Sequence, residues 1–175
     1  MKFQVADPIP FSLDEGFLLI RDEMPSLVPY MKDTESIEVL ERREEGETVH
    51  LVNQWRASNA SEPKALRGIM KPELLGWTDY ATWTTETRSA AWRLEALGSG
   101  KLFTCEGTTS VQEIDGEVKL CVDVDFSLHP ENIPGIPKLL ARTLTKQIEK
   151  FLVDLLKENM RQLAISMQKY AAERA

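Results

Sequence analysis

Residues 138–175 have the sequence KLLARTLTKQIEKFLVDLLKENMRQLAISMQKYAAERA, which contains neither glycine nor proline. Apolar side chains recur there at spacings of three and four, as in Ile148, Phe151 and Leu155, which predicts one long amphipathic helix. At about 1.5 Å per residue, such a helix would extend for roughly 55 Å. Because strand patterns dominate the middle of the chain, we expect the helix to lie across an antiparallel sheet. That arrangement tends to enclose a cavity and therefore favours ligand binding.

Three hairpins are expected before that helix, within residues 37–57, 77–97 and 102–128. Each combines alternating apolar and polar side chains with an interrupting turn. Only the third has a two-residue turn signature, Asp115-Gly116. The turns of the first two hairpins leave the strand register open.

The Asp115-Gly116 turn predicts the register of the third hairpin. If Ile114 pairs with Glu117, Cys105 lies opposite Phe126 on an apolar face. Cys121 then falls on the other face, which is predicted to be the wet one. Two cysteines on opposite faces cannot form a disulfide with each other, and we interpret both as packing residues.

The N-terminal part predicts a short strand and two short helices. Residues 2–6 form the expected strand, and the prolines after it end it. Ser12 and Glu15 have the spacing of a capping box, which predicts a helix ending near Asp22. A further helical turn or two is expected over residues 26–31.

The size and charge of the chain restrict its class. A length of 175 residues, 42% hydrophobic and 28% charged, fits one globular domain over residues 1–175. The formal net charge of −7 argues against nucleic-acid binding, which needs a basic surface. Two cysteines are too few for a disulfide framework. No segment has the apolar run of a signal peptide or a membrane span, so a cytoplasmic location is predicted.

The order of the expected elements resembles the START-like superfamily, also called SRPBCC. The local sequences that carry this resemblance are PFSLDEGF at residues 10–17 and IPGIPKLL at residues 133–140. It implies an α+β helix-grip fold, in which a curved six- or seven-stranded antiparallel sheet wraps around a long C-terminal helix and two short helices lie near the N-terminus. Such proteins commonly bind a hydrophobic ligand between sheet and last helix. Some carry lipids or quinones, a few catalyse cyclisation and others are co-chaperones, so the fold leaves the function open.

Three polar residues interrupt faces that otherwise predict a core. Asn53 lies between Leu51 and Trp55 on one strand face, and Asp79 lies between tryptophans on another. Asn159 interrupts the apolar stripe of the last helix. We hypothesise that all three orient a ligand in an apolar cavity. The expected lining residues are Trp55, Trp83, Trp92, Phe126 and Leu155.

A purely structural interpretation of these residues stays open. Asp79 would then lie in a loop before its strand, and Asn159 would lie where the helix leaves the sheet. The tryptophans would be ordinary core residues.

Catalytic and metal-binding patterns are missing from the sequence. His50 is expected on an outward strand face, and His129 begins a proline-rich connector. Neither has the partner expected of a general base. Histidines and cysteines occur singly, so we predict no metal and no cofactor.

Basic residues recur every four positions at the start of the last helix. They are Lys138, Arg142, Lys146 and Lys150. A solvated helix face is the favoured interpretation. Peripheral contact with an anionic membrane, or with an anionic ligand headgroup, stays open as an alternative.

The sequence therefore predicts non-catalytic binding or transport of a hydrophobic small molecule, such as a lipid, a quinone or a polyketide-like compound. Residues 56–76 or 129–137 would gate the cavity. One alternative is a cyclase or hydrolase that uses Asp79 as an acid or base. Another is a protein-interaction module, or a homodimer, that docks through an exposed helix end formed by Leu163, Met167 and Tyr170.

Overall fold

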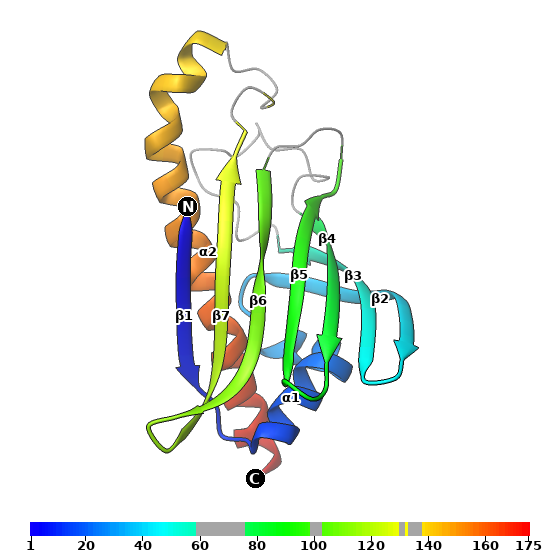
Figure 1. Cartoon of the computed structure of the whole chain (residues 1–175). Helices are drawn as coiled ribbons and strands as arrows, with labels where there is room; N and C mark the ends of the chain where they lie inside the picture. Colours follow the sequence, from blue (N-terminus) through cyan, green and yellow to red (C-terminus); the bar gives the residue numbers. More distant parts are fainter. Residues whose placement is uncertain (59–75, 99–102, 130–131, 133–137) are drawn as a thin grey trace.

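Seven strands form one curved antiparallel sheet in the order β1-β7-β6-β5-β4-β3-β2 (Figure 1). The computed structural model describes residues 1–58, 76–98, 103–129, 132 and 138–175, excluding the side chains of residues 138–149, 151, 152 and 155. The elements are β1 (Lys2–Pro8), α1 (Leu13–Asp22), η1 (Met24–Tyr30), β2 (Thr34–Glu45), β3 (Thr48–Ala57), β4 (Gly76–Thr84), β5 (Ser89–Ala96), β6 (Phe103–Ile114), β7 (Glu117–Leu128) and α2 (Lys138–Arg174). This arrangement confirms the predicted α+β helix-grip fold.

A capping box starts α1, as the sequence predicts. Ser12 Oγ accepts a hydrogen bond from the Glu15 backbone N–H at 3.3 Å, and Glu15 Oε2 accepts one from the Ser12 N–H at 3.0 Å. The next helical segment, η1, is a 3-10 helix that begins at Met24, two residues before the expected start. Pro25 and Pro29 lack the N–H groups of a regular α-helix, which explains the tighter form.

The β6–β7 hairpin has the predicted register. Ile114 pairs with Glu117, and Cys105 lies opposite Phe126. Asp115 and Gly116 both have positive φ, at 56° and 78°, as the two central positions of a type I′ turn require. The turn sequence therefore determines which residues of this hairpin share a face.

The first hairpin also closes through a two-residue loop, Gly46-Glu47. Glu45 therefore pairs with Thr48, which defines a strand register that the sequence left open. Gly46 adopts a φ of 60°, a conformation that glycine tolerates well. A register shift between Val39 and Glu41 interrupts the pairing of β2 with β3. This bulge is part of the edge strand β2.

The prediction of a wet environment for Cys121 is wrong. Cys121 lies on the face opposite Cys105, and both thiols are free, but Cys121 is buried. It pairs with Ser110 on one side and Ala6 on the other, inside the sheet. We attribute its burial to the longer side chains that flank this short thiol along β7.

The last helix, α2, runs along the β1 side of the sheet and ends near α1 (Figure 1). The described part of α2 packs mainly against η1, β1 and β7. Its buried side chains are Val153, Ala164, Ser166, Met167 and Tyr170. No helix among the described residues is both long enough and apolar enough to cross a membrane.

The interaction surface expected at the end of α2 is absent from the described structure. Met167 is 0% exposed and Tyr170 is 6% exposed, while Leu163 packs partly buried against the core. Tyr170 also stacks edge-on against Tyr30, with ring centroids 5.9 Å apart. The prediction that these residues form an exposed docking surface is therefore wrong, because η1 and the core cover them.

Candidate functional site

The inner face of the sheet, which carries the core, positions Asn53 and Asp79 opposite each other on β3 and β4. This row of paired residues continues across the sheet through Leu94, Cys105 and Phe126. Asp79 lies within β4, so the alternative that places it in a loop is wrong. Strand alternation and the β3–β4 register bring the two polar side chains together.

Asn53 is a buried polar residue, only 5% exposed. Its Nδ2 donates a long hydrogen bond of 3.4 Å to Asp79 Oδ2. Asn53 Oδ1 and Asp79 Oδ1 are both buried, and neither has a hydrogen-bond partner among the described residues. Leaving such groups unsatisfied costs about 1–3 kcal/mol each, which makes this pair unusual in a core.

Burial raises the pKa of Asp79 from 3.8 to about 6. Asn53 and Trp55 act in the opposite direction and lower this pKa, because both present N–H groups toward the carboxylate. The indole Nε1 of Trp55 nevertheless makes no hydrogen bond of normal geometry among the described residues. The Trp55 contact is therefore weak, and desolvation dominates the pKa of Asp79.

A pair of stacked indoles lies next to Asn53 and Asp79. Trp55 pairs with Trp77 across β3 and β4, and their ring centroids are 5.8 Å apart at an interplanar angle of 17°. The sequence predicts Trp55 as a site residue but does not single out Trp77. Strand alternation had already placed Trp77 on the face of Asp79, but the stacking depends on a register that the sequence left open.

Trp83 and Trp92 both make packing contacts within the described structure. Trp83 is 5% exposed and contacts the Phe17 ring of α1 edge-on, with centroids 5.7 Å apart. Trp92 donates from Nε1 to Thr109 Oγ1 at 2.9 Å, and its ring lies over Gly107. Trp83 Nε1 is buried and has no hydrogen-bond partner among the described residues, whereas the Trp92 indole N–H is satisfied. A ligand-lining role for these two indoles stays a prediction.

The other predicted site residues lie apart from the Asn53–Asp79 pair or outside the described part. Phe126 is buried in the same row, but three strands away from Asp79, roughly 14 Å at the usual strand spacing. The Leu155 side chain lies outside the described residues. Asn159 is half-buried, and no described hydrogen bond joins it to Asn53 or Asp79.

The cysteine and histidine closest in sequence pattern to a nucleophile or base lie in different environments. Burial, with smaller contributions from Asp125 and Asp79, raises the pKa of Cys105 to about 12, so its thiol stays neutral. His50 lies on the outer face, where its Nδ1 is 3.1 Å from Thr82 Oγ1. The described residues contain no group of three metal-ligating side chains.

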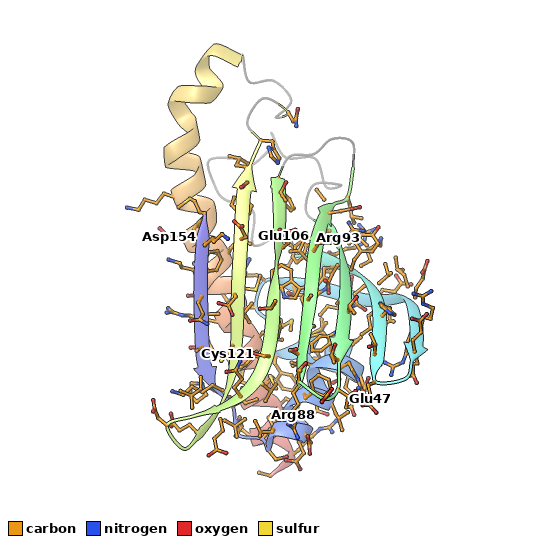
Figure 2. The ribbon with its side chains drawn as sticks, viewed as in Figure 1. Glu47, Arg88, Arg93, Glu106, Cys121 and Asp154 are labelled. Carbon is orange, nitrogen blue, oxygen red and sulfur yellow. The ribbon has the colours of Figure 1, made fainter. Side chains whose placement is uncertain are left out.

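Two shallow hollows, of about 440 and 640 Å³, lie on the outer face of the sheet. Both include Trp92 and Glu106 in their lining, and neither includes Asn53 or Asp79. Figure 2 shows this face, with Arg93 and Glu106 side by side on β5 and β6.

The predicted gating segments, residues 56–76 and 129–137, lie largely outside the described residues. Of the basic residues at the start of α2, only the exposed Lys150 has a described side chain.

Comparison with known proteins identifies the fold. No protein-family model and no curated protein matches this sequence. Among solved structures, the Zhui aromatase/cyclase from a Streptomyces species has a TM-score of 0.71 at 17% identity, covering 99% of this chain and 94% of that one. TTHA0849 from Thermus thermophilus has a TM-score of 0.67 at 19% identity, covering 98% and 99%. Ara h 8.0201 has a TM-score of 0.56 at 12% identity, covering 95% and 97%.

These similarities span nearly the whole chain and confirm the helix-grip architecture expected from the START-like resemblance. At such low identities they define the fold alone. The function must therefore be argued from the residues of this chain.

Proposed function

We propose that this protein binds a hydrophobic small molecule against the inner face of the sheet, between the sheet and α2, without transforming it. The observation that carries this proposal is the Asn53–Asp79 pair, whose two buried oxygens have no described partner on a largely apolar face. Ligand sites combine apolar walls with a few polar groups that fix orientation. Trp55 and Trp77 supply an aromatic wall beside the pair. The shared fold with a protein named as an aromatase/cyclase supports binding of a small molecule in general.

Native mass spectrometry of the purified protein, followed by organic extraction, tests this proposal. We expect a bound hydrophobic molecule to accompany the wild-type protein. Its occupancy should fall in Asn53→Ala, because that substitution removes a polar contact while leaving the tryptophans in place. Extraction and chemical analysis would also distinguish a lipid from a quinone or a polyketide-like compound.

Gln54→Ala and Thr78→Ala are matched controls. Gln54 and Thr78 face each other on the same two strands but point to the outer face. They should retain the ligand fully. Equal loss of ligand in the inner-face and outer-face variants would contradict the proposed location, and a ligand-free wild type that binds no added hydrophobic compound would contradict the function.

A second candidate function is proton-transfer catalysis by Asp79. Its favouring observation is the raised pKa of Asp79, since general acids and bases work best with a pKa near the operating pH. A cyclase or hydrolase activity would depend on pH near 6 and disappear in Asp79→Asn. Ligand binding without any turnover in the wild type would leave the carrier function as the only candidate.

Membrane contact through Lys138, Arg142, Lys146 and Lys150, a homodimer and a cytoplasmic location stay predictions. Co-sedimentation with anionic vesicles tests the membrane contact. Binding that charge reversal of Lys146 and Lys150 abolishes would support it, and no binding at low salt would exclude it.

A further inference from the structure

We infer that the site formed by Asn53 and Asp79 selects ligands whose polar end is a hydrogen-bond donor, a hydroxyl or an ammonium group, and rejects ligands that end in a carboxylate. This inference rests on the proposed function, because it assigns the chemistry of the same site. The two unpartnered buried oxygens carry it.

The Asp79 carboxylate determines which end of the Asn53 amide remains free. Asn53 Nδ2 donates to Asp79 Oδ2, and turning the amide around would bring two oxygen acceptors together. The amide oxygen, Asn53 Oδ1, is therefore left without a bond within the pair. Asp79 acts here as a positioning residue for Asn53 as well as a contact in its own right.

Both free atoms of the pair are acceptors. Asn53 Oδ1 and Asp79 Oδ1 can each accept a hydrogen bond, and neither offers a proton while Asp79 is ionised. A hydroxyl group can donate its single proton to one of these oxygens, whereas an ammonium group can donate to both. The nearby indole of Trp55 has one donor, Nε1, which also lacks a described partner. A ligand with one hydroxyl oxygen could accept from that indole while it donates to the pair.

A carboxylate ligand lacks the required proton and carries the wrong charge. It would place a second negative charge beside Asp79 in a poorly solvated region, where repulsion is strong. A purely apolar ligand would avoid repulsion but would leave both oxygens unsatisfied. Sites built to hydrogen-bond a hydroxyl discriminate strongly against analogues that lack it.

Two series of probes test this inference by equilibrium dialysis at pH 7.5. The aromatic series is 2-naphthol, 2-naphthylmethylamine, naphthalene and 2-naphthoate. The aliphatic series is 1-decanol, decylamine, decane and decanoate. Within the series that binds, we expect the alcohol or the amine to bind at least about tenfold more tightly than the apolar and carboxylate members. Whichever of the alcohol and the amine binds more tightly shows whether the preferred polar end of the ligand is a hydroxyl or an ammonium group.

Asp79→Asn changes the chemistry of the pair while nearly preserving its shape. It removes the negative charge and adds an amide N–H₂ that can donate to a carboxylate. We expect this variant to bind the carboxylate probe within about threefold of the alcohol. Thr78→Ala, on the outer face of the same strand, should keep the wild-type preference. Circular dichroism of both variants verifies that they are folded.

The outcomes separate the two proposals. If the carboxylate or apolar probe binds wild type as tightly as the donor probes, the donor selectivity is wrong and the binding function stands. If the preference is present but unchanged in Asp79→Asn, its assignment to this pair is wrong. If no probe of either series binds, the proposed function itself fails.

Discussion

At the residue scale, the most consequential feature is a carboxyl group held in a poorly solvated position. Asp79 has one long hydrogen bond, from Asn53, and its other oxygen lacks a described partner. Such an arrangement weakens the folded state whenever the carboxyl group is ionised. Residues that reduce stability in this way are frequent at functional sites.

Asp79→Asn should stabilise the protein at pH 7.5 and have little effect at pH 4. The pKa of Asp79 rises from an ordinary 3.8 to about 6 in the folded protein, so the folded state binds more protons between these values. Stability contributed by this group is present at low pH and is lost as the pH rises to about 6, by up to ~3 kcal/mol. The asparagine side chain of Asp79→Asn does not ionise, so the variant avoids this loss of stability at high pH. Urea unfolding of wild type and variant at both pH values measures the difference, and an equal effect at both would contradict the assignment.

Gly107→Ala should destabilise the protein by about 2–3 kcal/mol through overpacking. A Cβ at this position would lie 2.0 Å from the Asp123 backbone oxygen and 2.7 Å from Trp92 Cζ2. Displacement of the indole from Thr109 would relieve only the second contact, so the backbone of β6 or β7 must also shift. Tryptophan fluorescence and urea unfolding measure both effects. Thr108→Ala, at the exposed neighbouring position, serves as the control and should differ little from wild type.

At the element scale, the C-terminal half of α2 holds the helix to the rest of the fold. Met167 is fully buried, Tyr170 contacts Tyr30, and Tyr30 donates a hydrogen bond to Glu173 at 2.7 Å. Gln168 Nε2 also donates to the Pro8 carbonyl at 2.7 Å. These contacts join the last turns of α2 to η1 and to the end of β1.

Met167→Ala should lower the free energy of unfolding by about 2–4 kcal/mol, the usual effect of truncating a buried methionine. Lys169→Ala, at an exposed position two residues later, should change it by less than about 0.5 kcal/mol. Thermal and urea unfolding compare the two variants. A negligible effect of Met167→Ala would indicate that the helix end is not packed as described and would reopen the interaction-module alternative.

At the scale of the whole molecule, the two edges of the sheet differ. The edge strand β1 lies against α2, whereas β2 is the other edge and is exposed along residues 38–45. Val39 and Leu40 are 43% and 46% exposed at the bulge of β2. Charged residues such as Arg42 and Glu44 surround them and oppose uncontrolled edge pairing.

Hydrogen exchange should therefore be fast in β2 and slow in β6 and β7. Residues 105–110 of β6 and 119–125 of β7 are paired with strands on both sides, whereas β2 has one neighbour and an exposed surface. Mass-spectrometric exchange of the native protein measures this order. Strong protection of β2 that disappears on dilution would instead reveal a second copy of the chain at this edge and would support a homodimer.

Local patterns in the chain predict much of the fold. The capping box of Ser12 and Glu15, the Asp115-Gly116 turn and the periodicity of residues 138–175 each involve neighbours in sequence, and all three predicted their elements correctly. Strand alternation also placed Asn53 and Asp79 on core-facing positions. Each of these signals acts over a few residues, where backbone geometry and side-chain spacing are sufficient.

The candidate site depends on contacts that such patterns do not encode. Asn53 meets Asp79 only through the register of β3 and β4, whose connecting residues 58–75 carry no short-turn signature. The same register stacks Trp55 on Trp77, while the β5–β6 register and packing join Trp92 to Thr109. The burial of Met167 and Tyr170 likewise depends on η1, which packs against the end of α2 and cannot be placed there from the sequence pattern of the helix alone. Local sequence thus determined the helices, the capped and turned segments and the core-facing side of the strands. Long-range packing decided the burial of the end of α2 and which side chains meet in the core, because pairing across long connections is selected by the free energy of the whole assembled core.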